Sequence, residues 1–358
     1  MNISLRAIVG ILFLLPAFTG FAQTSSTPAP QTAARANKQL ETVKTVTSSS
    51  TEDHTFELPL TCDETGNIYM KSRTDGFSAI HKYNLAGERV SSFAASTCPD
   101  IKVQIAGGFF VAPDGRVSQV VFSPNDAQSS ILVFKDDGSC HSKVKLDTPF
   151  SFQPYQLAVL PSGAMLISGL RWSVRDKAYL AYLGLFSAGG TVLKEVDLAD
   201  ESSLEEPAVG KPATLATRDT TKPDPSVTRG DMQLAADGKT YLLRSGSPAE
   251  IYAISQGGVV VRRFTIDPAV SGLRPLQIHV DGTRIAVLFQ NPGPGSERTL
   301  LKVVDLHGNT IAEYEHLVTD GRATLFATFA CYSYPGDRFT FLTTSRDNNL
   351  VMKIAEPR

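Results

Sequence analysis

From Leu40 to the end of the chain, short apolar runs alternate with clusters of Gly, Asp, Asn and Pro, and no long run has helical periodicity. Typical runs are Leu157–Leu160 and Tyr241–Leu243. Runs of this length, bounded by turn-forming residues, are characteristic of strands. The pattern therefore predicts an all-β domain.

Six segments of the chain follow one plan, in which a tight turn containing Gly separates two apolar runs. Asp-Gly and Ser-Gly pairs favour hairpin turns because Gly adopts positive φ without a steric clash. The six turns are Asp63–Asn67, Pro113–Arg116, Pro161–Ala164, Asp237–Lys239, Asp281–Thr283 and Pro335–Asp337.

A second turn follows the first in five of these six units. Two hairpins per unit make a four-stranded antiparallel blade, so the repeat predicts a six-bladed β-propeller. A lipocalin-like barrel or a two-domain sandwich also fits the strand content, but neither explains the paired hairpins. The second turns are Ala86–Glu88, Asp137–Ser139, Gly189–Gly190, Gly257–Gly258 and His307–Asn309.

The sixth unit is one strand short, because Leu350–Ile354 forms its third strand and the chain stops at Arg358. The β-prone run Glu41–Thr47 precedes the first unit and can supply the missing strand. Closure by this N-terminal strand removes the exposed edges that an open ring would have. The alternative is a three-stranded last blade.

The N-terminus has the features of a secretory signal. Arg6 precedes the largely apolar run Ala7–Phe18, and small residues follow up to Ala22. We therefore expect a signal peptide over residues 1–22, a flexible Ser/Thr/Pro/Ala-rich linker over 23–39 and a propeller domain over 40–358. The mature chain is expected to be extracytoplasmic, either periplasmic or secreted, without a membrane span.

Residues 199–230 interrupt the repeat spacing between the third and fourth units. An insertion of this length is either a functional lid or a disordered excursion, and the sequence leaves both open. The chain has 358 residues, of which 42% are hydrophobic, and a net charge of −2. This charge gives no reason to expect nucleic acid or an anionic membrane as a partner.

Four cysteines in an oxidising compartment allow up to two disulfides. Cys62 and Cys331 occupy nearly equivalent positions in the first and sixth units, which are neighbours in a closed ring. We therefore consider a Cys62–Cys331 bridge, with the alternative that the two strands lie too far apart. Cys98 falls between blades and Cys140 in a hairpin turn, so these two are expected on opposite faces.

Two segments, Arg274–Gly282 and Pro154–Gly163, resemble the entry into a blade of six-bladed propellers of the NHL-repeat and gluconolactonase (SMP-30-like) type. The resemblance covers roughly residues 55–358. It concerns the order of strands and turns, so it implies the fold rather than the function.

SMP-30-like enzymes hold a divalent metal with a Glu that opens the first blade and with Asn and Asp that open later blades. Glu57 stands where the resemblance places the Glu, but Tyr155 replaces the Asn and Asp231 stands one place late. A shift of one residue turns a strand side chain to the other face. The alternative function is therefore a lactonase or related hydrolase that uses Ca²⁺ or another divalent cation. Our first expectation is that the protein has no cofactor.

Several arginines fall in loops that the predicted register brings to one face. We expect them to form a polar, partly cationic bowl for an anionic or sugar-like ligand, with solvated loop ion pairs as the alternative. No nucleophile elbow, metal-spaced histidines or nucleotide motif is present. The first hypothesis is thus a non-catalytic module that binds a small molecule or a protein. The candidate residues on this face are Arg73, Arg171, Trp172, Arg229, Asp231, Arg244, Arg274, Arg322 and Arg346.

Overall fold

The computed structural model describes the chain from residue 38 onward, with internal gaps. The predicted signal peptide, residues 23–37 of the predicted linker and residues 200–230 of the predicted insertion lie outside the described residues. The described ranges are 38–48, 56–72, 79–99, 101, 105–123, 128–199, 231–244, 246, 248–291, 298–324, 328–334, 336–345, 347 and 349–358.

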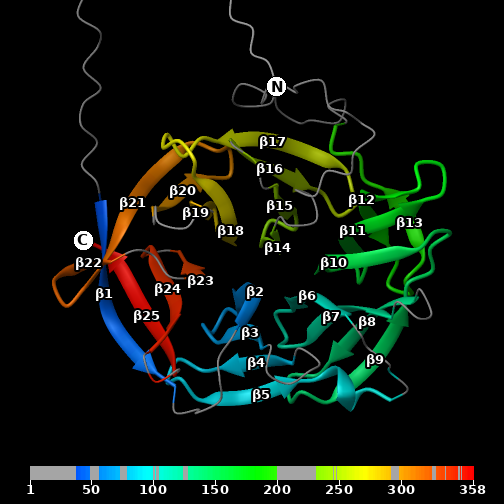
Figure 1. Ribbon diagram of the computed structural model, residues 1–358, viewed down its shortest axis with the longest axis horizontal. Helices are drawn as coiled ribbons and strands as arrows, with labels where there is room; N and C mark the ends of the chain where they lie inside the picture. Colours follow the sequence, from blue (N-terminus) through cyan, green and yellow to red (C-terminus); the bar gives the residue numbers. More distant parts are fainter. Residues whose placement is uncertain are drawn as a thin grey trace, which may run out of the picture. The chain divides into compact units, whose positions relative to one another are not determined.

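These residues confirm the all-β fold, because apart from the short 3₁₀ helix η1 (Ala95–Thr97) they form strands, turns and loops. No helix in the described part of the chain is long and apolar enough to cross a membrane. Sheets of antiparallel strands form a propeller-like ring (Figure 1).

Four of the sheets are separate and four-stranded, and their strands follow one another in chain order. The first contains β2 (Phe56–Cys62), β3 (Ile68–Ser72), β4 (Ile80–Tyr83) and β5 (Arg89–Phe93). The second contains β6 (Ile105–Val111), β7 (Val117–Ser123), β8 (Gln128–Phe134) and β9 (Cys140–Lys145). The third contains β10 (Phe152–Val159), β11 (Met165–Ser173), β12 (Ala178–Phe186) and β13 (Val192–Glu195). The fourth contains β14 (Met232–Leu234), β15 (Thr240–Arg244), β16 (Ala249–Ile254) and β17 (Val260–Ile266).

The remaining nine strands form one sheet rather than two separate ones, which differs from the predicted six separate blades. Its main path runs β18-β19-β20-β21-β1-β25-β24-β23, and β22 pairs with β21 off this path. Its strands are β1 (Lys38–Thr47), β18 (Arg274–Asp281), β19 (Arg284–Gln290), β20 (Thr299–Asp305), β21 (Thr310–Thr319), β22 (Arg322–Thr324), β23 (Thr328–Ser333), β24 (Arg338–Thr344) and β25 (Leu350–Pro357).

The N-terminal strand β1 joins the two ends of the described chain, as the sequence predicts. It pairs antiparallel with β25, for example Val46 with Met352, and parallel with β21, for example Leu40 with Leu317 (Figure 1). The strand begins at Lys38, so the predicted linker ends slightly earlier than residue 39. Because both edges of β1 are paired, this part of the ring has no open strand edge.

The apolar core is divided among six clusters of buried residues, and each cluster lies between consecutive groups of four strands. Tyr69 and Phe93 of the first sheet, for example, pack against Phe134 of the second. One cluster lies between the two halves of the nine-stranded sheet and includes Leu288 from one half and Phe341 from the other. Burial of aromatic and aliphatic side chains between sheets is therefore the main force that holds the ring together.

The outer hairpin turns dock onto the sheet that precedes them in the ring. Gly190 has φ of +87°, and its carbonyl accepts a hydrogen bond from the backbone of Asp147 at 2.9 Å. A Cβ atom on Gly190 would overlap the carbonyl of Lys145, and one on Gly138 would overlap that of Ser92. The predicted turn glycines are therefore required both by backbone conformation and by packing between sheets.

We predict that Gly190→Ala lowers the free energy of unfolding by at least about 2 kcal/mol, because it combines positive φ with a clash against fixed backbone. The neighbouring Gly189 has no positive φ, and a Cβ atom on it would lie 3.7 Å from its nearest neighbour. Gly189→Ala is therefore the matched control and should change stability by less than about 0.5 kcal/mol. Urea denaturation of both variants measures the difference, and equal stabilities would contradict the docking of this turn.

Removal of β1 tests the closure of the ring. Deletion of residues 1–47 takes away both pairings of β1 and exposes the edges of β21 and β25. We expect the product to be aggregation-prone or to lose several kcal/mol of stability. Deletion of residues 1–37 is the control, because it leaves β1 complete and should preserve the thermal midpoint. Equal thermal midpoints for the two deletions would refute the structural role of β1.

Candidate functional site

The candidate site lies at one end of the sheets, which we call the loop end. It comprises the starts of the innermost strands and the turns that join second to third strands. Register places Arg171 opposite Phe152 at the start of β10, and Arg244 opposite Glu250 at the start of β16. Arg274 likewise opens β18, opposite Gln290 at the end of β19. These predicted residues therefore share the loop end of their respective sheets.

Two of the predicted arginines are engaged by their own sheets. The Arg171 Nη1 donates to Glu195 at 2.6 Å, and its guanidinium lies over the rings of Phe150 and Tyr182. Arg244 Nη1 lies 3.1 Å from Glu250 in a similarly local ion pair. Because each guanidinium is largely neutralised by a neighbouring carboxylate, the loop end is less cationic than the sequence predicts.

The other predicted arginines divide into three cases. The Arg274 side chain is exposed and makes no hydrogen bond or ion pair with the described residues. Arg322 lies on β22, which pairs with the outer strand β21 and not with an innermost strand, so its place in a binding face stays a prediction (Figure 1). The remaining three, Arg73, Arg229 and Arg346, lie outside the described residues.

Asp231 is fully enclosed rather than presented to a ligand. Its carboxylate accepts the backbone N–H groups of Met232 at 2.9 Å and of Ile278, on the next innermost strand, at 3.1 Å. Burial raises its pKa to about 6, although these two hydrogen bonds act in the opposite direction. Asp231 therefore serves to join β14 to β18, a role that its position in the sequence does not reveal.

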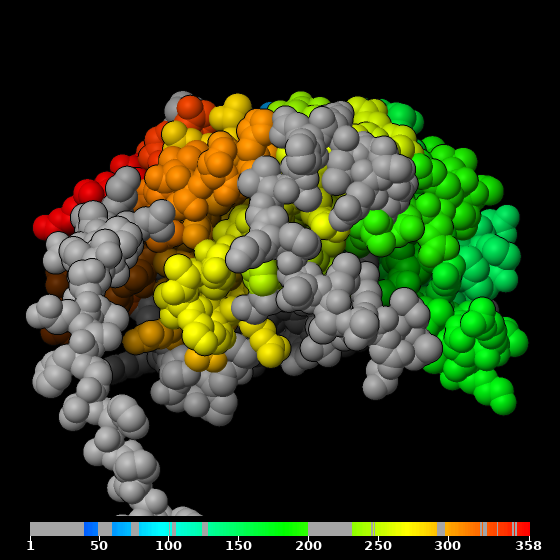
Figure 2. Space-filling model, turned by 90° about the horizontal axis from the view of Figure 1, so that it is seen from above, coloured from blue at the N-terminus to red at the C-terminus, as the bar shows by residue number. Residues whose placement is uncertain are grey.

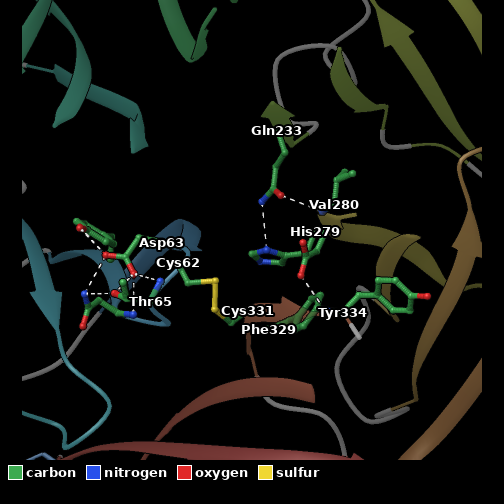
Figure 3. Close-up of a disulfide and its surroundings, with 12 residues drawn as sticks. Cys62, Asp63, Thr65, Gln233, His279, Val280, Phe329, Cys331 and Tyr334 are labelled. Atoms are coloured by element: carbon green, nitrogen blue, oxygen red, sulfur yellow. Dashed lines mark hydrogen bonds between the residues drawn. A yellow bond between two sulfur atoms is a disulfide. The ribbon is translucent and has the colours of Figure 1, made fainter. Parts of the chain in front are cut away.

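His279 is a buried residue of the innermost strand β18, and no sequence motif singles it out (Figure 3). The Gln233 Oε1 accepts the N–H of Val280, so the Gln233 amide nitrogen faces His279 Nδ1, at 3.3 Å. Nδ1 is thus the acceptor and Nε2 carries the proton of the neutral ring. Burial lowers the pKa of His279 to about 3, and its ring packs edge-on against Phe329 at 4.6 Å.

The single tryptophan, Trp172, lies at the tip of the β11–β12 hairpin. It stands opposite Tyr179 in the register, and the two ring centroids are 5.1 Å apart. Both side chains are exposed, at 37% for Trp172 and 42% for Tyr179. The sequence points to Trp172 but not to Tyr179, because only the cross-strand register shows that they are neighbours.

Glu57 stays a predicted metal ligand, because the structure describes only the backbone of this residue, in β2. Within the described ranges, no three His, Cys, Asp or Glu side chains form a group that could hold a metal ion.

The four cysteines form two disulfides. Cys62 and Cys331 bridge the innermost strands β2 and β23, with 5.6 Å between their Cα atoms (Figure 3). Cys98 bonds to Cys140, so the expectation that these two lie on opposite faces is wrong. Cys98 directly follows η1 and packs in one apolar cluster with Cys140, the first residue of the outer strand β9.

No protein-family model and no curated protein matches this chain. Among solved structures, the chain is similar to a Bacteroides fragilis protein provisionally described as exported, with a TM-score of 0.54 and 8% identity over 91% of this chain and 97% of that one. It also aligns with a Bacteroides caccae protein of unknown function, with a TM-score of 0.47 and 13% identity over 73% and 82% of the two chains. A provisionally described gluconolactonase aligns with a TM-score of 0.48 and 10% identity over 89% and 95%. At 8% identity the likeness to the Bacteroides fragilis protein shows the fold alone. Together with the ring of sheets, it defines the chain as an all-β protein of the propeller-like class.

The neutral state of buried His279 predicts a pH dependence of stability. Its pKa of about 3 in the folded state lies below its unfolded value of 6.5, so protonation of the ring favours unfolding. The contribution of the neutral ring to the free energy of unfolding is therefore complete above pH 6.5 and is lost as the pH falls. The raised pKa of Asp231 acts in the opposite direction over the same pH range but is present in both proteins. Between pH 7 and pH 4 we therefore expect wild type to lose about 3 kcal/mol more stability than His279→Gln. Urea denaturation across this range measures it, with His141→Gln as the exposed control. A wild-type slope retained in His279→Gln would contradict the assignment.

Proposed function

We propose that the chain is an extracytoplasmic six-bladed propeller that binds a small molecule or a protein through its loop end, without catalysis. For the six blades, the nine-stranded sheet divides into β18–β21 and β23–β25 with β1, and each part repeats the four-strand order of the separate sheets. An apolar cluster separates these two parts, as it does every other consecutive pair. This supports two blades joined by the β1–β21 contact.

An extracytoplasmic location is supported by several observations. The signal-like sequence over residues 1–22 is one. All four cysteines are paired, as is usual for proteins of oxidising compartments. The similar Bacteroides fragilis protein is itself provisionally described as exported.

The binding role is supported above all by what the loop end leaves exposed. Trp172 and Arg274 are exposed there, and tryptophan and arginine are the residue types most enriched in binding hot spots. Asp231, in contrast, is buried and has both carboxylate oxygens bonded to backbone N–H groups. The loop end thus presents groups suited to holding a ligand, while its enclosed carboxylate has a structural task.

The competing function is a metal-dependent lactonase of the SMP-30-like type, which depends on Glu57 and on the sequence resemblance. The two functions are distinguished by measuring bound Ca²⁺, Mg²⁺ and Zn²⁺ in the purified protein and its turnover of D-glucono-1,5-lactone. We expect much less than one bound metal ion per chain, and a rate of lactone turnover no higher than that of the Glu57→Gln variant. Stoichiometric metal together with turnover that Glu57→Gln abolishes would establish the lactonase instead.

The binding role itself is tested by charge reversal at the two ends of the sheets. Immobilised wild-type protein, Arg274→Glu and Arg116→Glu are exposed to an envelope extract, and retained molecules are quantified by mass spectrometry. Arg116 is the control, because it is exposed in the Pro113–Arg116 turn at the opposite end and its side chain, within the described ranges, pairs only with Asp114. We expect Arg274→Glu to lose a ligand that Arg116→Glu retains. Identical retention by all three proteins would refute binding through the loop end.

A further inference from the structure

The β11–β12 hairpin is the longest among the second and third strands, and it carries two exposed aromatic rings. Each of its strands has nine residues, and the pair continues to Ser173 and Ala178, beyond Phe152 at the start of β10. Figure 2 shows the green part of the chain, which includes this hairpin, projecting from one side of the molecule. Trp172 and Tyr179 lie near its tip, with an angle of 67° between their rings.

The tip of the hairpin is held in one conformation by its own hydrogen bonds. The Ser173 hydroxyl donates to the Asp176 carboxylate at 2.7 Å and accepts the backbone N–H of Asp176 at 3.2 Å. Lys177 completes the turn with a φ of +49°. Below the tip, Arg171 is fixed by Glu195 and by the ring of Tyr182. The two aromatic side chains are therefore pre-organised, which lowers the entropic cost of binding.

Trp172 and Tyr179 together form what we call the aromatic platform. Tyr155 lies on the innermost strand β10 of the same sheet and is half-buried. Burial, and then the charge of Tyr179, raise the pKa of the Tyr155 phenol.

We propose that the aromatic platform binds a glycan, whose pyranose rings stack on Trp172 and Tyr179 while its hydroxyl groups bond to the polar edge of the tip. This proposal rests on the proposed function, since it names the ligand class of the loop end. A pyranose ring has an apolar C–H face that matches an aromatic ring, and a rim of hydroxyls. Donors and acceptors for that rim are available from Ser173, Asp176, the Trp172 indole N–H and the Tyr179 hydroxyl.

The small size of the exposed surface favours a glycan over a protein partner. At 37% and 42% exposure, the two rings together offer roughly 200 Å² of accessible aromatic surface. A stable protein interface requires about 800 Å² from each partner. The turn at the tip is also exposed: Val174 and Arg175 are at 82% and 93%, and Asp176 and Lys177 are exposed as well. A ligand of two or three sugar rings, by contrast, fits a platform of this extent.

The single tryptophan allows a direct test, because all tryptophan fluorescence of the protein comes from the platform. The full mature chain is titrated with cellohexaose, chitohexaose and a hyaluronan octasaccharide. At least one of them should shift the emission to the blue and reduce acrylamide quenching severalfold. Calorimetry should then show affinity weakened at least tenfold by Trp172→Ala and by Tyr179→Ala, and less by Trp172→Phe, which keeps a ring for stacking.

Tyr334→Ala is the matched control. Tyr334 is also an exposed aromatic residue, at 36%, but it lies after β23 beside Arg284, away from the platform. Its substitution should leave glycan affinity within twofold of wild type. The thermal midpoint of each variant shows whether it is folded. If one of the three platform variants does not fold, the other two still allow the test.

Four results would overturn the proposal. The first is that acrylamide fails to quench Trp172 in the free protein, and the second is that none of the three glycans binds. The third is that Trp172→Ala binds a glycan as tightly as wild type does. The fourth is that the ligand that depends on Trp172 is a protein and not a glycan. The proposed function fails separately, through identical retention by the Arg274→Glu and Arg116→Glu proteins. If Arg274→Glu loses a ligand while no glycan binds the platform, only the glycan proposal falls.

Discussion

The structure depends above all on the pairing of β1 along both of its edges. Seven residue pairs join it to β25 and four join it to β21. A ring of sheets is stable only when the last sheet meets the first, because an unpaired edge leaves backbone N–H and C=O groups without partners. The same seam is fastened on the inner side by Cys62–Cys331, which crosslinks residues 269 positions apart. Every loop at the loop end takes its position from this closure.

Unpaired backbone groups also occur on the innermost strands. Each of these strands has one edge that pairs with no other described strand, and side chains of the preceding sheet bond to some of the backbone N–H and C=O groups on that edge. Asp231 accepts the N–H of Ile278, and the Gln277 amide bonds to both the N–H and the C=O of Phe329. Polar side chains near the axis therefore have a structural explanation. This is why Asp231, a candidate ligand-binding residue in the sequence, is a weak indicator of chemistry.

Local chemistry explains which features could be predicted from the sequence. Gly66, Gly138 and Gly190 each adopt positive φ in the predicted turns, because a tight turn leaves few other residues possible. The closing strand was predictable because the last unit lacked one. Features that depend on tertiary contacts were not predictable. The parallel β1–β21 contact, the β22 hairpin that moves Arg322 outward and the Cys98–Cys140 bond all join segments whose proximity has no local signature.

The arginines show why candidate binding residues need a structure to be separated. Arg171, Arg244 and Arg274 look alike in the sequence, yet the first two have carboxylate partners on their own sheets and the third has none among the described residues. Arg171 still has a part in the proposed binding, because its contacts with Glu195 and Tyr182 fix the base of the hairpin that carries Trp172. A hairpin that is already rigid loses little conformational entropy on binding, so the proposed glycan site gains from an arginine that touches no ligand.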